Sequence, residues 1–407
     1  MNVCLISREY PPETGWGGIG TYTYQLAHGL AAQGHLVHVL AQSLDQDKDY
    51  FDGQVHLHRI AHQTVFPYKG RFSEFALRLE YSQRVYQRLK ELIVQYKIDV
   101  VEAPNLSAEG FIYSLFKKVP LVVRLHTPYS EVIEFSKWPR TLDRRLSCWL
   151  EDAVILKSDL ITCSTVAHAG LIFRQLGLDL NGNVKKIPLG VPLPEIKRDI
   201  QLNHKKKGPT VLFVGRLEKR KGVHLLVQAI PVILDQIPEA SFQIIGRDTF
   251  LTADVISFTG NQNQSFQTKL INNLPEKYRD RVHFLGYVED NKLAEYYSCC
   301  DLFVAPSLYE SFGFIYIEAM AHGKPVIGSK VGGVSEVVID QETGILVPPK
   351  DVVSLAESII SLLKDRPRKE KMGQAARRHV EMNFTRDLMA ERTLKVYRKV
   401  LDDQAKK

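Results

Sequence analysis

The chain has 407 residues, which is too long for one ordinary hydrophobic core and suits two domains of the α/β class. Its composition, 44% hydrophobic and 24% charged, is that of a globular protein, and no apolar run approaches the roughly 20 residues of a membrane-spanning helix. The formal net charge of +7 is mild and no aromatic and basic recognition module is present, so we expect no nucleic-acid partner.

The first half of the chain alternates short apolar runs with amphipathic helical stretches. The opening run, residues 2–7, lacks the basic lead-in of a signal peptide, so it predicts a buried strand and a cytoplasmic protein. This β-α-β order predicts a parallel sheet with helices on both faces. The expected elements are strands at 3–6, 36–41, 100–102, 121–126 and 160–164, and a helix at 22–33.

The alternation stops between residues 191 and 209, where prolines, polar residues and a lysine run indicate a connector, and then it resumes. Open α/β sheets bind ligands beyond the carboxyl ends of their strands, so we expect the site in a cleft between two facing sheets. The later elements are strands at 210–214, 241–245, 282–285, 302–305, 325–328 and 345–347, and a helix at 223–234. The predicted organisation is a Rossmann-like N-terminal domain at 1–190 that binds the acceptor, a linker at 191–209, a Rossmann-like C-terminal domain at 210–385, and a helix at 386–407 that packs back on the N-terminal domain.

A glycine-rich loop follows the first strand, and Gly15, Gly17 and Gly20 in it spell GxGxxG. Glycines allow a backbone to approach a diphosphate, and the helix that begins near Gly20 directs its positive end there. A dinucleotide fingerprint begins directly at a strand end, whereas here seven residues separate Ser7 from Gly15, and the next strand ends without the ribose-binding acid. We favour a diphosphate loop, with a NAD-dependent dehydrogenase and a plain structural loop as alternatives.

The first strand of the second domain ends in a loop that carries Arg216 and Lys221, with Gly215 and Gly222 beside them. An anion would lie at this end of the strand, and two fixed cations neutralise a diphosphate without a metal. The alternative is a solvated run of charges.

The strongest pattern is a pair of carboxylates, Glu310 and Glu318, eight residues apart after the strand at 302–305. The later part of this segment predicts a helix, with Glu310 before it and Glu318 within it. Carboxylates accept hydrogen bonds from vicinal hydroxyls, so Glu310 would hold a sugar and Glu318 a ribose. The amides from Phe312 to Phe314 would lie at the helix N-terminus, where they suit a diphosphate.

Taken in order, these motifs resemble glycosyltransferase family 4, the retaining transferases of the GT-B fold, over nearly the whole chain. The signature E-x7-E is met by Glu310 and Glu318, and the basic segment by Arg216 and Lys221. The pattern GG-x2-E is met by Gly332, Gly333 and Glu336, and the segment Arg124-Leu125-His126-Thr127 also fits. Each motif is weak alone, but the ordered set is specific.

The resemblance implies a role for each matching position. His126, Glu310, Arg216 and Lys221 would form the catalytic set, with His126 near the 6-hydroxyl of the transferred sugar. Glu336 would brace a loop. The donor-binding residues would be Gly17, Gly18, Arg216, Lys221, Tyr287, Val288, Glu310, Ser311, Phe312, Gly313, Phe314 and Glu318.

The expected reaction is transfer of a hexose from a UDP-sugar to a hydroxyl of a glycan or glycolipid in polysaccharide biosynthesis. Glucose is the first candidate for the hexose. Retention could follow a covalent double displacement or a same-face attack; no second carboxylate is well placed for the former, and the resemblance implies the latter. No metal or cofactor is expected. The DxD-like acids at 45–49 are interpreted as solvated, because they fall in a polar loop and not at a buried strand end. A non-catalytic nucleotide-sugar-binding protein of the same fold is the second alternative.

Basic and aromatic residues alternate irregularly between positions 135 and 149. One interpretation is a surface patch that contacts anionic membrane at its inner face, which a lipid-linked acceptor would favour. The other is an ordinary helix that packs Trp149 and Leu150 inward.

Overall fold

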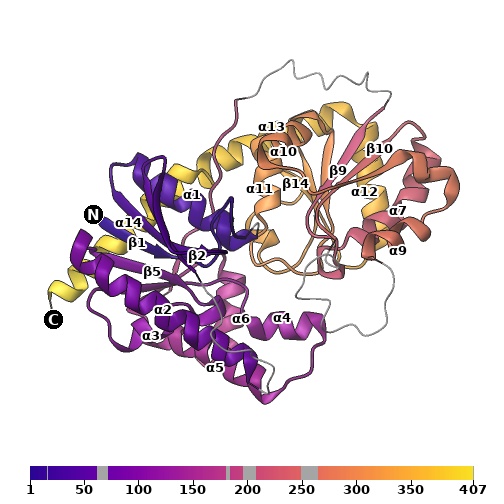
Figure 1. The fold of residues 1–407 in the computed structure, drawn as a ribbon. Helices are drawn as coiled ribbons and strands as arrows, with labels where there is room; N and C mark the ends of the chain where they lie inside the picture. The colour runs from indigo at the N-terminus through magenta and orange to yellow at the C-terminus, as the bar shows by residue number, and fades with distance from the viewer. Residues whose placement is uncertain (16, 62–71, 180–183, 196–207, 249–264, 407) are drawn as a thin grey trace. The chain divides into compact units, whose positions relative to one another are not determined.

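The structure, a computed structural model, describes residues 1–15, 17–61, 72–179, 184–195, 208–248 and 265–406. Within them the chain forms two compact units, residues 1–192 with 385–407 and residues 193–384 (Figure 1). The division at Pro192 falls inside the predicted linker, most of which lies outside the described residues. None of the described helices combines the length and the apolar character that a membrane span requires.

The N-terminal unit is built on an eight-stranded sheet in the order β3-β4-β2-β1-β5-β6-β7-β8. All neighbours are parallel except β3 and β4. Helices α1 and α14 pack together, and α2, α3 and α5 form a second group (Figure 1). The strands are β1 (Asn2–Ile6), β2 (Leu36–Ser43), β3 (Lys48–Asp52), β4 (Val55–Ala61), β5 (Val100–Pro104), β6 (Leu121–Arg124), β7 (Leu160–Cys163) and β8 (Val184–Lys186). The helices are α1 (Gly18–Ala32), α2 (Ser73–Tyr96), α3 (Phe111–Leu115), α4 (Tyr129–Ser136), α5 (Leu142–Lys157), α6 (Val166–Gln175) and α14 (Arg386–Ala405).

The C-terminal unit has a six-stranded, all-parallel sheet in the order β11-β10-β9-β12-β13-β14. The strands at the middle of this sheet are nearly continuous apolar runs that are buried along their length, as parallel strands with two covered faces require. The strands are β9 (Thr210–Val214), β10 (Ser241–Ile245), β11 (Val282–Gly286), β12 (Leu302–Ala305), β13 (Val326–Ser329) and β14 (Gly344–Val347). The helices are α7 (Val223–Gln236), α9 (Phe266–Asn272), α10 (Asp290–Cys299), α11 (Phe314–Ala321), α12 (Val352–Lys364) and α13 (Arg366–Asn383).

The last helix, α14, belongs to the N-terminal unit. Thr385 caps it by accepting a hydrogen bond from the Leu388 amide, and Gly29 of α1 lets the two helices approach, since a Cβ there would lie 3.0 Å from the Cβ of Ala390. Tyr397 then donates to the buried carboxylate of Glu102 at 2.9 Å. A helix near the end of the sequence thus completes the first unit.

The predicted polar loop at residues 45–49 is wrong in its second half. Residues from Lys48 onward form β3, an antiparallel edge strand that turns into β4 at Gly53, whose φ is +61°. The Asp52-Gly53 pair is a common hairpin signal that the interpretation missed. The acids here are also engaged: Asp47 accepts the Ala61 amide at 2.6 Å.

The region interpreted as a membrane patch is only partly exposed. Arg144 is buried, 3.4 Å from Glu74 and with its guanidinium over the Trp138 ring, so it cannot serve a surface patch. Trp149 is 54% exposed rather than packed inward, whereas Leu150 is buried as expected. The membrane-patch interpretation was therefore wrong for Arg144, and the inward-packing interpretation was wrong for Trp149.

A buried histidine makes the N-terminal unit sensitive to acid. His168 of α6 is 1% exposed, and burial, followed by the nearby Arg124, lowers its pKa to about 4. The neutral form of His168 is compatible with burial, and the pKa in the unfolded chain is near 6.5. Its contribution to the free energy of unfolding is therefore complete above pH 6.5 and is lost as pH falls toward 4. At pH 5 this residue alone should cost about 2 kcal/mol of unfolding free energy.

Urea unfolding of the parent and of His168→Gln, each at pH 7.5 and pH 5, measures this effect. Between pH 7.5 and pH 5, the free energy of unfolding of the variant should fall by about 2 kcal/mol less than that of the parent, because glutamine does not titrate. Equal losses in both proteins would contradict the assignment to His168.

Candidate functional site

Two loops of the C-terminal unit meet where the strand order of its sheet reverses, between β9 and β12. In open α/β sheets, ligands bind beyond the carboxyl ends of the strands at such a point. The loop after β9 carries Arg216 and Lys221, and the loop after β12 carries Glu310. The Leu308 amide donates to the Arg220 carbonyl at 2.7 Å, which joins the two loops.

Lys221 and Glu310 form an ion pair, with Nζ 2.6 Å from Oε1. Glu310 is buried, and the Ser307 hydroxyl donates to the same Oε1 at 3.0 Å. Burial alone would raise the pKa of Glu310, but the charges of Lys221 and Arg220 and these hydrogen bonds together lower it. The carboxylate is therefore ionised at neutral pH and faces a fixed cation.

The other cations of the loop differ in their surroundings. The Arg216 side chain is 62% exposed and lies 3.3 Å from Glu218. Arg220, which the sequence analysis did not single out, pairs with Glu218 at 2.7 Å and donates to the Tyr309 carbonyl at 3.3 Å. Arg216 is thus an accessible cation, and Arg220 braces the loop.

Helix α11 begins at Phe314, so Glu310 precedes the helix and Glu318 lies within it, as predicted. Gly313 stands at the N-cap with φ +93°, a conformation that favours glycine. Such a helix start leaves the first amides, here those of Gly313, Phe314 and Ile315, without intrahelical partners. Glu318 accepts a hydrogen bond from the Tyr297 hydroxyl at 2.9 Å, so it is held in place from α10.

The paired glycines hold the backbone of Glu310. The Gly333 amide donates to the Glu310 carbonyl at 2.9 Å, and a Cβ on Gly332 would lie 2.2 Å from that same oxygen. Gly332 also has a φ of +49°, which side chains adopt rarely. The GG-x2-E segment, with η5 (Val334–Glu336), therefore supports the acid that was singled out on other grounds.

Gly332→Ala is expected to lower the sugar transfer that the family resemblance implies at least about tenfold, because the added Cβ must displace the Glu310 backbone. Initial transfer rates of the variant and the parent test this. Gly323→Ala is a matched control, since Gly323 also has a positive φ of +69° but its Cβ would have only one neighbour, at 3.9 Å. Equal losses in the two variants would mean that backbone strain, and not the contact with Glu310, is responsible.

Two of the predicted donor-binding residues, Tyr287 and Val288, follow β11, at the same edge of the sheet. Tyr287 is 40% exposed, and the Arg247 guanidinium lies 4.4 Å from its ring centroid. Val288 is half-buried beside it. Gly286, with φ +66°, turns the chain just before them.

His126 lies in the N-terminal unit, two residues after β6. Its amide donates to the Asn105 side chain at 2.6 Å, and its ring is 5.4 Å from that of Tyr22. Burial, followed by the charges of Arg124 and His168, places the pKa of His126 well below its usual value. The ring is therefore neutral at pH 7, which suits hydrogen bonding to a hydroxyl rather than proton donation.

The glycine loop divides its glycines between two tasks. Gly15 has a φ of +66°, and a Cβ on Gly20 would lie 2.9 Å from the Gly15 carbonyl, so these two serve the turn. Gly17 caps α1 with an extended backbone, and a Cβ on Gly18 would meet no atom within 4 Å. The space at Gly18 leaves room for the diphosphate that the sequence predicts there; Trp16 lies outside the described residues.

Comparison with known proteins places this geometry in a family. The family model of Glycosyltransferase Family 4 matches residues 16–194, and that of Glycosyl transferases group 1 matches residues 195–379. The glycogen synthase of Mycobacterium tuberculosis is 27% identical over 421 aligned residues, which cover 98% of the chain and 94% of the relative. A phosphatidyl-myo-inositol mannosyltransferase of Mycobacterium leprae is 27% identical over 418 residues, covering 99% and 97%.

The fold comparison agrees with this result. Sucrose-phosphate synthase from Thermosynechococcus elongatus superposes with a TM-score of 0.78 at 26% identity and covers 99% of both chains. The two family models follow one another along the chain, and the relatives span nearly all of it. The chain therefore belongs to the glycosyltransferases of group 1 and Family 4, with the GT-B fold.

Proposed function

We propose that this glycosyltransferase transfers a hexose from a UDP-sugar to a hydroxyl of a glycan or glycolipid, with retention of the anomeric configuration. Glucose is the first candidate for the hexose. The observation that carries the proposal is the buried ion pair of Lys221 and Glu310 at the reversal point of the C-terminal sheet, next to the exposed Arg216. Cations and a carboxylate at one point suit a ligand with both phosphates and hydroxyls.

Each group would act through its charge. Arg216 and Lys221 would bind the diphosphate and stabilise the charge that develops on it as the bond to the sugar breaks. Lys221 and Ser307 both donate to Oε1 of Glu310, which leaves Oε2 as the oxygen that we assign to the sugar hydroxyls. Since two cations already neutralise the leaving group, the reaction would need no metal.

The ribose and base would bind at the neighbouring segments. Glu318 would accept hydrogen bonds from the ribose, held in place by Tyr297, and backbone groups near Tyr287 and Val288 would contact the base. The amides from Ser311 to Phe314 would hold the phosphates. The roles of Gly17, Gly18 and His126 toward donor and sugar stay predictions of the family resemblance.

The test is the release of UDP by the protein in EDTA, with UDP-glucose, UDP-galactose, UDP-N-acetylglucosamine and GDP-mannose compared as donors. Release from one UDP-sugar, stimulated by an oligosaccharide or lipid acceptor, would support the proposal, and the NMR coupling of the product's anomeric proton would report retention. Tight UDP binding without release from any donor would instead indicate a non-catalytic binding protein.

Arg216→Ala should weaken UDP binding about 10- to 100-fold, because it removes a charge-assisted contact worth about 1.5–3 kcal/mol. Calorimetric titration with UDP measures the change. Arg366→Ala serves as the control, since Arg366 is an 82% exposed arginine on α13 of the same unit. Unchanged UDP affinity in Arg216→Ala would remove this residue from the donor site.

A further inference from the structure

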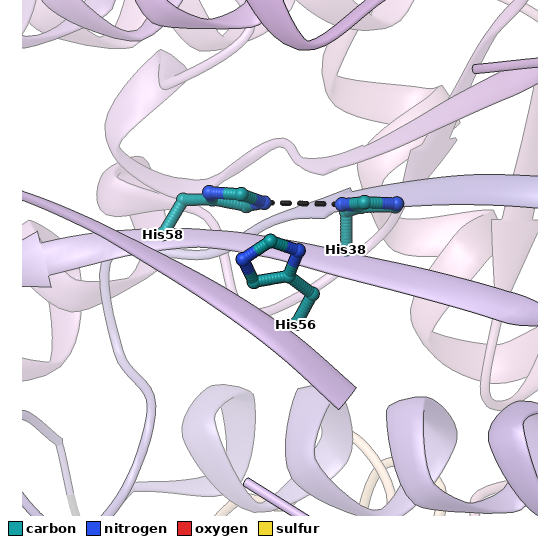
Figure 2. Close-up of side chains that lie close together, drawn as sticks. All are labelled: His38, His56 and His58. Carbon is teal, nitrogen blue, oxygen red and sulfur yellow. Dashed lines mark hydrogen bonds between the residues drawn. The ribbon is translucent and has the colours of Figure 1, made fainter. Parts of the chain in front are cut away.

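Three histidines gather on two neighbouring strands of the N-terminal sheet, and none of them belongs to the motifs assigned to the donor site. His38 lies on β2, and His56 and His58 lie on β4. The register pairs His38 with His56, and His58 is two residues further along β4, so all three side chains share one face of the sheet. Figure 2 shows the three rings turned toward one another.

The ring nitrogens are close enough to share one ion. Nδ1 of His38 and Nε2 of His58 are 3.0 Å apart, and one nitrogen from each of the three rings lies within 4.8 Å of the others. Two nitrogens on one tetrahedral zinc ion are separated by about 3.3 Å, from zinc–nitrogen distances of about 2.0–2.1 Å. Each nitrogen–nitrogen distance would therefore have to change by no more than about 1.5 Å for the three rings to coordinate one ion.

The surroundings hold the rings in place. His38 and His58 are buried, whereas His56 is half-buried. The ring of Tyr96 lies 4.3 Å from that of His38, and the ring of Phe51 stacks on His56 at 4.4 Å. A preformed cluster of this kind loses little conformational freedom when an ion binds.

A carboxylate lies beside one ring. Oδ1 of Asp49 is 3.0 Å from Nδ1 of His58, while the other nitrogen of this ring, Nε2, faces His38. Arg88 in turn contacts the other oxygen of Asp49. A histidine whose second nitrogen faces a carboxylate is the usual arrangement around a metal-binding imidazole.

We propose that His38, His56 and His58 bind one divalent transition-metal ion through three imidazole nitrogens, with zinc as the first candidate. The ion would replace the hydrogen bond between His38 and His58, and water would take the fourth position on the half-exposed side of His56. Three neutral imidazoles without a thiolate suit Zn²⁺, and also Cu²⁺ and Ni²⁺, better than Mg²⁺ or Ca²⁺. The site would join β2 to β4 and does not depend on the proposed donor site.

The test is zinc binding by the untagged full chain, stripped with EDTA, desalted and titrated with Zn²⁺ against a chromogenic chelator. We expect one equivalent bound, and Co²⁺ in its place should show the visible absorption of a tetrahedral nitrogen site. His56→Ala and His58→Ala should not compete with the chelator, and Asp49→Asn should bind about 10- to 100-fold more weakly.

His283→Ala is the matched control, because His283 is an exposed histidine of the C-terminal unit and should leave zinc binding unchanged. Thermal unfolding without metal identifies any variant that does not fold. His56 and Asp49 are half-exposed, so their variants test the proposal even if loss of the buried His58 prevents folding. The proposal is overturned if the parent binds no zinc against the chelator, or if His56→Ala and Asp49→Asn bind as the parent does.

Discussion

Glu310→Gln is expected to lower sugar transfer at least about 100-fold while UDP affinity stays within a few-fold of the parent. The amide retains the shape of the side chain but offers one acceptor where the carboxylate offers two, so it holds sugar hydroxyls poorly. The phosphates would be held by Arg216 and Lys221, which the substitution leaves in place. Initial transfer rates and calorimetric titration with UDP give the two values.

Glu276→Gln is the control for this change, since Glu276 is an exposed acid on η4 (Glu276–Arg281) of the same unit. It should leave both transfer and UDP binding as they are. Near-normal transfer in Glu310→Gln would show that another group holds the sugar. A parallel loss of UDP affinity would show that Glu310 contributes to the nucleotide and not to the sugar.

Lys221→Met should lower the free energy of unfolding by about 3 kcal/mol, because it leaves the buried carboxylate of Glu310 without its partner. UDP binding should also weaken, through loss of a phosphate contact. The two effects are separated by urea unfolding in the absence of nucleotide and by calorimetry with UDP.

The double variant Lys221→Met/Glu310→Gln is the sharper form of this test. Removing both charges should recover most of the lost stability, because no buried charge remains unpaired, but it should not recover UDP binding. If the double variant is less stable than Lys221→Met alone, the ion pair is not the source of the destabilisation.

The chemistry-bearing residues of the C-terminal unit could be predicted because charge and position coincide in the sequence. Arg216, Lys221 and Glu310 each follow an apolar strand, and the carboxyl ends of parallel strands meet at one edge of a sheet. The order of the strands cannot be read from periodicity, so the direct contact of Lys221 with Glu310 became evident only in the structure.

The roles of the supporting residues escaped prediction because these roles depend on contacts between distant segments. Ser307 resembles an ordinary loop residue and Gly332 was predicted only as part of the GG-x2-E pattern, yet one donates to the Glu310 carboxylate and the other lies against its backbone. The edge strand β3 was missed for a related reason, since its charged sequence lacks the apolar alternation of a half-buried strand. That strand supplies Asp49 to the histidine cluster.

The most direct measurement of the central claim is calorimetric titration of the protein in EDTA with UDP, GDP, ADP and NADH in parallel. The account predicts that UDP binds without metal and that NADH does not, since we propose that Arg216 and Lys221 bind a nucleoside diphosphate. Binding of NADH with none of the three diphosphates would contradict it, and binding of GDP or ADP in place of UDP would contradict the choice of donor.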